Sequence, residues 1–169
     1  GIAMDRVFGF YYNEDLDSLR DAGIELVTVD TLKDNALPDI DGLIVGGGFP
    51  EAFIDDLARN QGLLADIRRQ AEDGLPVYAE CGGLMYLSRS LRWGDRSGAM
   101  VGLVPGDTVM GERPVGRGYA SLRQRQVSPL GEPDGETIPA HEFHYSHLEN
   151  LPPNLDYAYE VERGHGMDG

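Results

Sequence analysis

A strand that turns sharply into a helix is predicted by residues 76–87, PVYAECGGLMYL, with a cysteine at the turn. Cys81 has a small residue two positions before it, Ala79, and another two positions after it, Gly83. A tight turn of this kind needs small residues there because the backbone passes close by, and it lifts the side chain at its apex to the carboxyl edge of the sheet. Helix N-termini also favour a thiolate. We therefore predict that Cys81 is a nucleophile, whereas an isolated cysteine is more often a small buried hydrophobe.

Strands and helices alternate around this turn. A first helix is predicted after the N-cap Asn13. A second starts at Pro50 and is interrupted at residues 59–62, and a third runs from Gly83 to Leu91. The predicted strands are residues 7–12, 24–29, 42–45 and 76–79. This alternation predicts an α/β fold of three layers with a mainly parallel central sheet. Beyond Trp93, extended runs near 119–127 and 138–144 are expected to complete one domain, residues 1–169.

Composition excludes several kinds of partner. The 169 residues contain 14 Lys and Arg against 29 Asp and Glu, a formal charge of −15. A surface with this much negative charge repels phosphate backbones and anionic lipid. We therefore expect neither nucleic acid nor membrane as a partner. No apolar run approaches the roughly 20 residues that span a bilayer, and residues 1–6 do not resemble a signal peptide. The single cysteine excludes an internal disulfide framework and is typical of the cytoplasm.

A glycine-rich loop, Gly46-Gly47-Gly48, follows the predicted strand 42–45 and precedes a helix. The residues that would make it a phosphate loop are absent, and a tight turn between strand and helix is the alternative interpretation. In a doubly wound sheet, however, this loop lies at the same carboxyl edge as Cys81. We predict that the N–H of Gly47 or Gly48, together with the N–H of Gly82, stabilises an oxyanion.

Three histidines lie close together in the segment 141–147, HEFHYSH. Cysteine chemistry needs a base that also protonates a leaving amine, and histidine suits both tasks near neutral pH. Strand alternation puts Glu142, His144 and Ser146 on one face, with Phe143 and Tyr145 facing a core. His144 is therefore the predicted base. The two other histidines, His141 and His147, are expected to be structural or solvated; a zinc site and ordinary polar loop residues are the alternatives, and we predict no metal.

Taken together, these motifs resemble the C-terminal glutamine amidotransferase domain of cobyrinate or hydrogenobyrinate a,c-diamide synthases. The resemblance covers nearly the whole chain and is specific in the cysteine and histidine motifs combined. It is carried by residues 8–12, 46–51, 79–87, 118–119 and 141–146. It implies the three-layer fold of class I glutamine amidotransferases, which is flavodoxin-like, and an enzyme that hydrolyses L-glutamine to supply ammonia for the amidation of a corrinoid.

The resemblance also implies roles for residues. Cys81 corresponds to the nucleophile and His144 to its base, with Gly48 and Gly82 as oxyanion donors. The wider class carries His-x-Glu, whereas Ser146 stands in the glutamate position here, which implies a Cys–His dyad oriented by a backbone carbonyl or by Glu142. Glutamine itself is expected to contact the segment 110–119, through Arg113 or Arg117 and through Tyr119, with a simple surface charge as the alternative interpretation of either arginine.

The chain lacks the GxxxxGK[ST] motif of a nucleotide-binding loop. The resemblance implies an N-terminal ATP-dependent synthetase domain outside these residues, which would bind ATP, Mg²⁺ and the corrinoid acceptor, and no cofactor in this domain. The acceptors of nickel sirohydrochlorin a,c-diamide synthase and of cobyric acid synthase are alternatives. A catalytically idle regulatory domain is an alternative function, and a homodimer is left as a further expectation for the quaternary structure.

Overall fold

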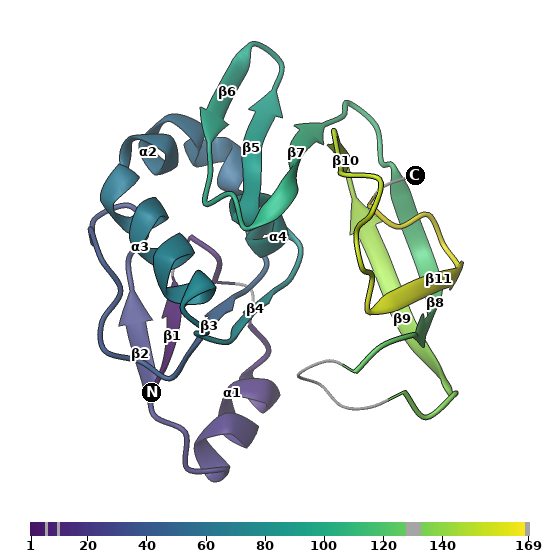
Figure 1. Ribbon diagram of the computed structural model, residues 1–169, viewed down its shortest axis with the longest axis horizontal. Helices are drawn as coiled ribbons and strands as arrows, with labels where there is room; N and C mark the ends of the chain where they lie inside the picture. The colour runs from purple at the N-terminus through teal and green to yellow at the C-terminus, as the bar shows by residue number, and fades with distance from the viewer. Residues whose placement is uncertain (6, 10, 128–132, 168–169) are drawn as a thin grey trace. The chain divides into compact units, whose positions relative to one another are not determined.

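The computed structural model describes all of the chain except residues 6, 10, 128–132 and 168–169. It forms two compact units, Gly1–Pro105 and Gly106–Gly169, and each is described by itself (Figure 1). A four-stranded parallel sheet with the order β2-β1-β3-β4 forms the centre of the first unit. Its strands are β1 (Ile2–Asp5), β2 (Leu26–Val29), β3 (Gly42–Val45) and β4 (Val77–Ala79). The predicted parallel sheet is therefore confirmed.

Helices and one hairpin complete the first unit. They are α1 (Asn13–Asp21), the 3₁₀ helix η1 (Pro50–Phe53), α2 (Ile54–Arg59), α3 (Gln61–Glu72), α4 (Gly82–Leu87), and the antiparallel strands β5 (Ser88–Trp93) and β6 (Arg96–Ala99). The start at Pro50 and the break are both confirmed. The break falls at Asn60, whose side-chain oxygen accepts from the Leu63 N–H and so caps α3. Ile54, Leu57, Leu63 and Ile67 are almost completely buried and form the core on this side.

The predicted strand at residues 7–12 is wrong, although residue 10 lies outside the described part of the chain. The strand is β1, which ends at Asp5, and Val7 and Phe8 form a turn. Phe8 is fully buried, with its ring centroid 5.0 Å from that of Tyr86. Phe8 therefore packs in the core instead of extending the sheet, whereas Tyr12 is exposed. α1 begins at Asn13 itself, one residue earlier than the predicted N-cap implies.

The predicted helix from Gly83 to Leu91 is also wrong in its second half. α4 ends at Leu87, and Ser88 adopts extended φ and ψ of −66° and 171°. The fully buried Ser88 hydroxyl lies 2.6 Å from the Met85 carbonyl oxygen and 2.9 Å from that of Ser90. Serine competes in this way with helical backbone hydrogen bonds. Leu91, which continues the apolar spacing of a helix, is instead a buried residue of β5.

Antiparallel strands make up the second unit. They are β7 (Val104–Met110), which begins just before the unit boundary, β8 (Gly116–Gln124), β9 (Thr137–His144), β10 (Ser146–Glu149) and β11 (Tyr159–Arg163). β10 pairs with β7, and β8 is the central strand of the sheet β11-β8-β9. The extended runs predicted beyond Trp93 therefore lie in β8 and β9, and the remaining strands of this unit were not predicted individually.

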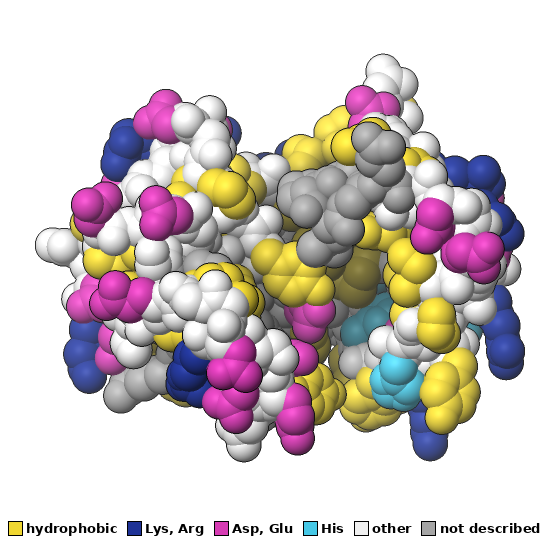
Figure 2. All heavy atoms as spheres, turned by 90° about the horizontal axis from the view of Figure 1, so that it is seen from below, with side chains coloured by type: hydrophobic (Ala, Val, Ile, Leu, Met, Phe, Trp, Pro, Cys, Tyr) yellow, Lys and Arg dark blue, Asp and Glu magenta, His cyan; other side chains and the backbone are white. Residues whose placement is uncertain are grey.

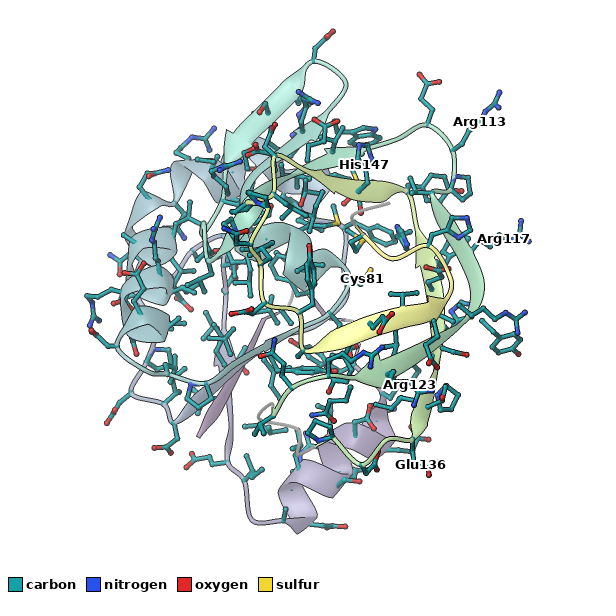
Figure 3. The ribbon with its side chains drawn as sticks, turned by 45° about the vertical axis from the view of Figure 1, so that its right-hand side comes forward. Cys81, Arg113, Arg117, Arg123, Glu136 and His147 are labelled. Atoms are coloured by element: carbon teal, nitrogen blue, oxygen red, sulfur yellow. The ribbon has the colours of Figure 1, made fainter. Side chains whose placement is uncertain are left out.

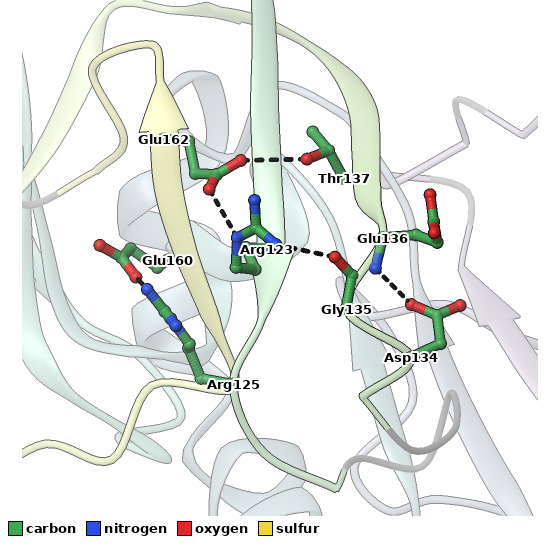
Figure 4. A network of polar contacts seen from close by, with 8 residues as sticks. All are labelled: Arg123, Arg125, Asp134, Gly135, Glu136, Thr137, Glu160 and Glu162. Carbon is green, nitrogen blue, oxygen red and sulfur yellow. Dashed lines mark hydrogen bonds and ion pairs between the residues drawn. The ribbon is translucent and has the colours of Figure 1, made fainter.

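A polar network joins the three strands of that sheet (Figure 4). Arg123 of β8 pairs with Glu162 of β11 and donates to the Gly135 carbonyl oxygen, while Thr137 of β9 donates to Glu162. The hydrogen bond from Arg123 lowers the pKa of Glu162. Arg125, which directly follows β8, forms a second ion pair with Glu160 of β11.

The surface of the protein carries many acidic side chains. They are scattered over the face seen in Figure 2, in keeping with the net charge of −15.

Candidate active site

Cys81 occupies the turn between β4 and the start of α4 (Figure 3). Its φ of 50° and ψ of −113° place it outside the regions that side chains prefer. Among the described residues, only Cys81 and Asn150 combine a side chain with a positive φ. Backbone strain of this kind costs of order 1–3 kcal/mol and persists where the surrounding structure holds it. Cys81 is exposed and forms no disulfide, so the predicted sharp turn with an accessible side chain at its apex is confirmed.

The small residues around the cysteine are required by backbone contacts. A Cβ atom added to Gly83 would lie 2.1 Å from the Val45 carbonyl oxygen, at the end of β3. One added to Gly82 would lie 2.6 Å from the Gly48 carbonyl oxygen. Gly83 also donates its N–H to the Gly46 carbonyl oxygen at 3.1 Å. The elbow is therefore packed directly onto the glycine-rich loop, as the sequence predicted.

This packing brings the backbones of Gly48 and Gly82 together. Gly82 is the first residue of α4, and the N–H of a first helical residue has no acceptor within its own helix. Gly48 is held from its other side, because an added Cβ would lie 2.3 Å from the Val7 carbonyl oxygen. In contrast, the Gly46 N–H donates to the Tyr11 hydroxyl at 3.2 Å and is occupied. Of the loop glycines, Gly47 and Gly48 therefore remain as candidate oxyanion donors.

A cavity of about 380 Å³ opens beside the elbow within the first unit. Its lining includes Tyr11, Leu16, Leu19, Ile44, Tyr78 and Glu80. Leu16 and Leu19 face this cavity from α1, a helix in which no residue is buried. These two leucines of α1 thus line an open cavity instead of a closed core.

His144 is the last residue of β9, and its side chain is only 14% exposed. Its Nδ1 lies 2.8 Å from the Ser146 carbonyl oxygen. A carbonyl oxygen only accepts, so this contact requires the proton on Nδ1 and leaves Nε2 with the lone pair. The backbone carbonyl, which was one of two predicted alternatives, therefore sets the tautomer that a base acting through Nε2 needs.

Glu142 lies beside the other ring nitrogen. Its Oε2 is 3.5 Å from His144 Nε2, and the described residues offer that buried nitrogen no hydrogen-bond partner. The carboxylate accepts from the backbone N–H of His165 at 2.9 Å and of Gly166 at 3.2 Å. Burial acts to raise the pKa of Glu142, but these N–H groups and the neighbouring His165 imidazole outweigh it and lower that pKa. Glu142 is therefore ionised near neutral pH.

Gly116 of β8 makes room for this pair. It is opposite His144 in the β8–β9 ladder, and an added Cβ would lie 2.2 Å from His144 Nε2 and 2.8 Å from Glu142 Oε2. Neither Gly116 nor the contacts from His165 and Gly166 were predicted. The small residues at alternate positions of β8, Gly116, Gly118 and Ala120, are the signal that could have indicated a strand face occupied by larger side chains.

The prediction that Phe143 and Tyr145 face a core is wrong. Phe143 is 55% exposed and Tyr145 is 37% exposed, and their rings meet edge to face at 5.7 Å. The alternation itself is correct, but the enclosed face is the one with Glu142 and His144. His141 is exposed against the ring of Tyr119, and His147 pairs with Glu149 at 3.1 Å.

The residues predicted to contact glutamine are exposed and lie apart from His144 within the second unit. Arg117 and Tyr119 are opposite Phe143 and His141 in the β8–β9 ladder, on the face that points away from His144. Tyr119 is 79% exposed. Arg113 lies in a bend before β8, and both arginine side chains project away from the ribbon in Figure 3. The structure thus does not bring these three residues onto the face that carries His144.

No group of three His, Cys, Asp or Glu side chains within the described ranges is arranged to hold a metal ion. Nor is any helix in that part of the chain long and apolar enough to cross a bilayer.

The model of the CobB/CobQ-like glutamine amidotransferase domain matches residues 1–169. The chain belongs to this family. It is 43% identical to the cobyrinate a,c-diamide synthase of Magnetococcus marinus and 44% identical to that of Archaeoglobus fulgidus. Both matches cover 100% of this chain and 36% of the relative, so the chain spans little more than a third of the length of these relatives. It is therefore a glutamine amidotransferase domain that matches one part of longer proteins.

Solved structures support the fold alone, since their sequence identities are low. PurLQS from Thermotoga maritima has a TM-score of 0.66 at 16% identity, covering 99% of this chain and 76% of its own. A glutamine amido transferase from Methylobacillus flagellatus has a TM-score of 0.62 at 21% identity, covering 95% of this chain and 61% of its own. The predicted fold class, that of class I glutamine amidotransferases, is confirmed.

Proposed function

We propose that this chain hydrolyses L-glutamine through a dyad of Cys81 and His144 and supplies the ammonia to an amide-forming reaction. The observation that carries the proposal is the strained elbow at Cys81, which is packed onto the glycine loop and leaves the thiol exposed. Membership of a glutamine amidotransferase family supports the choice of glutamine as substrate.

The reaction follows from the groups on these elements. Nε2 of His144 takes the thiol proton, and the Cys81 sulfur attacks the carboxamide carbon of glutamine. The N–H groups of Gly82 and of Gly48 or Gly47 stabilise the oxyanion. When the C–N bond breaks, the imidazolium returns its proton to the leaving nitrogen, which departs as ammonia and leaves a γ-glutamyl thioester. Water then attacks the thioester, giving its proton to Nε2, and glutamate is released.

Recognition of the amino acid end of glutamine requires a cation for its α-carboxylate. We assign this task to Arg113 or Arg117, each of which can contact a carboxylate through two N–H groups. Tyr119 is the proposed neighbour of the bound substrate. All three residues are exposed, but Arg117 and Tyr119 lie on the strand face opposite His144, so the chemistry of the residues, and not their position, supports this assignment.

The proposed acceptor of the ammonia is cobyrinate, at its a and c acetate carboxylates, because the similar relatives are named cobyrinate a,c-diamide synthase. ATP, Mg²⁺ and the corrinoid would then be bound by a separate N-terminal synthetase domain, with no cofactor in this domain. A cytoplasmic location and a homodimer are part of the same proposal. Nickel sirohydrochlorin and cobyric acid synthesis are the alternative acceptor reactions.

Substitution of the dyad tests the proposal. In the complete protein, Cys81→Ala should abolish glutamine hydrolysis, and His144→Ala should lower kcat about 10²- to 10⁴-fold, the usual contribution of a general acid and base. His147→Ala is the matched control because this histidine belongs to the same motif but pairs with Glu149, and its effect should stay within a few-fold. Hydrolysis that survives Cys81→Ala would overturn the assignment of the nucleophile.

A further inference from the structure

We infer that Glu142 is a positioning residue that stabilises the protonated form of His144 during catalysis, in place of the carboxylate that Ser146 does not provide. This inference rests on the proposed function, since it assigns His144 a proton to carry. It differs from the His-x-Glu arrangement of the wider class in where the carboxylate comes from and in which ring nitrogen it approaches. The carboxylate comes from two residues before the histidine and lies on the side of Nε2, while the backbone carbonyl of Ser146 holds Nδ1.

The contact between the two side chains changes sign when the ring is protonated. With the proton on Nδ1 only, Nε2 carries a lone pair 3.5 Å from the negatively charged Glu142 Oε2, and that contact is unfavourable. After Nε2 receives the thiol proton from Cys81, the same two atoms form a charge-assisted pair. Because the side chains of Glu142 and His144 are only 12% and 14% exposed, water screens this attraction weakly. Glu142 thus favours the imidazolium intermediate over the resting ring.

Glu142 is held in its ionised form by a segment far along the chain. The backbone N–H groups of His165 and Gly166 donate to its oxygens, and His165 Nδ1 lies 3.4 Å from Oε1. The segment is itself anchored, since Leu148 of β10 donates its N–H to the Met167 carbonyl oxygen at 2.7 Å. These donors favour the carboxylate over the acid, so Glu142 stays charged and does not accept the catalytic proton.

A second pair in the same motif provides a matched control. His147 and Glu149 are separated by the same two positions, with 3.1 Å between His147 Nε2 and Glu149 Oε1. Their side chains are 36% and 41% exposed, so solvent screens this pair more strongly. Removing the charge from Glu142 deletes a histidine–carboxylate interaction in an enclosed place. Removing it from Glu149 deletes the same kind of interaction in a half-exposed place.

The test compares Glu142→Gln with Glu149→Gln in the complete protein by measuring kcat, KM and the pH profile of glutamine hydrolysis. Glu142→Gln should lower kcat about tenfold with little change in KM, and the acidic limb of the profile should move to lower pH by about one unit, which corresponds to a tenfold change in proton affinity. Within the described contacts, the titratable groups that face Glu142 are His144 and His165. The substitution His165→Ala should therefore be measured beside it, and should leave the limb in place if His144 is the group observed.

Glutamine retains an oxygen that accepts from the His165 and Gly166 N–H groups, so Glu142→Gln should fold, and circular dichroism of both variants checks this. Glu142→Asp keeps the charge and should retain the wild-type position of the limb even if kcat falls. An unshifted limb in folded Glu142→Gln, or an equal shift in Glu149→Gln, would overturn the role of Glu142. Either result leaves the proposed function intact as long as Cys81→Ala abolishes hydrolysis.

Discussion

Gly116 shows how closely individual residues control this chemistry. It lies under the side chains of His144 and Glu142, where an added Cβ would be 2.2 Å from His144 Nε2. Gly116→Ala should displace the imidazole and lower glutamine hydrolysis at least tenfold. Because the displaced atoms are the ends of side chains, the free energy of unfolding should change by only about 1 kcal/mol.

The control for this prediction is Gly118→Ala, in the same strand. Gly118 has a φ of 125°, and nothing lies within 4 Å of an added Cβ. This substitution should therefore cost stability through backbone strain and leave His144 in place. If Gly116→Ala hydrolysed glutamine as fast as wild type, the arrangement of His144 above β8 would be wrong.

Ser88 determines where α4 ends, because the chain changes from helix to strand at this residue. Ser88→Ala removes the single hydroxyl proton that is shared between the Met85 and Ser90 carbonyl oxygens in a fully buried place. We expect a loss of about 2 kcal/mol in the free energy of unfolding, measured by urea denaturation. Ser97→Ala in the exposed part of β6 should stay within about 0.5 kcal/mol. An equally small effect at Ser88 would mean that other contacts end α4.

Elements with strong local signals were predictable from the sequence, and those decided by distant contacts were not. Residues 42–45 are a β3 strand with the predicted bounds, and Asn60 interrupts the helical run as expected. The aromatic run after Val7 has the composition of a strand, but Phe8 is drawn into the core against Tyr86. The continuation of α4 through Leu91 was misjudged because apolar spacing cannot reveal where a serine hydroxyl replaces the helical ladder.

The active-site region follows the same division. Cys81, Gly82 and Gly83 carry a local steric requirement, so their arrangement could be predicted. The period of two in β9 also placed Glu142 and His144 on one face, but periodicity does not tell which face is enclosed. That choice depends on the small residues of β8 and on the segment at 164–167, which are distant in sequence.

For the molecule as a whole, acid should weaken the fold despite relieving the repulsion of a net charge of −15. Asp66 of α3 is representative. Burial acts to raise the pKa of Asp66, but the Arg69 guanidinium, the Leu37 N–H and the Gln70 amide outweigh it and lower that pKa. Because the pKa of Asp66 is lower in the folded state, the unfolded chain binds more protons than the folded chain as the pH falls through the ordinary carboxyl pKa of about 4. The contribution of Asp66 is therefore complete above about pH 5 and is lost as the pH falls through its lowered pKa.

Thermal unfolding between pH 7 and pH 3 measures this effect. In the wild-type protein, Tm should decrease once the pH is lower than about 4. Asp66→Asn should reduce Tm at pH 7 and make its decrease in acid less steep. Asp73→Asn controls for loss of a charge, since Asp73 contacts the same arginine from a position that is 70% exposed. An acidic decline as steep in Asp66→Asn as in wild type would show that Asp66 does not contribute in this way.

The most direct test of the Cys81 assignment is covalent labelling of the complete protein by diazo-oxo-norleucine, an electrophilic mimic of glutamine, followed by peptide mass spectrometry. We predict one adduct per chain on the peptide that contains Cys81, formed more slowly when glutamine competes and absent from Cys81→Ala. An unlabelled Cys81 in protein that hydrolyses glutamine would contradict the account, because the thiol at the elbow would then not be the atom that attacks the substrate.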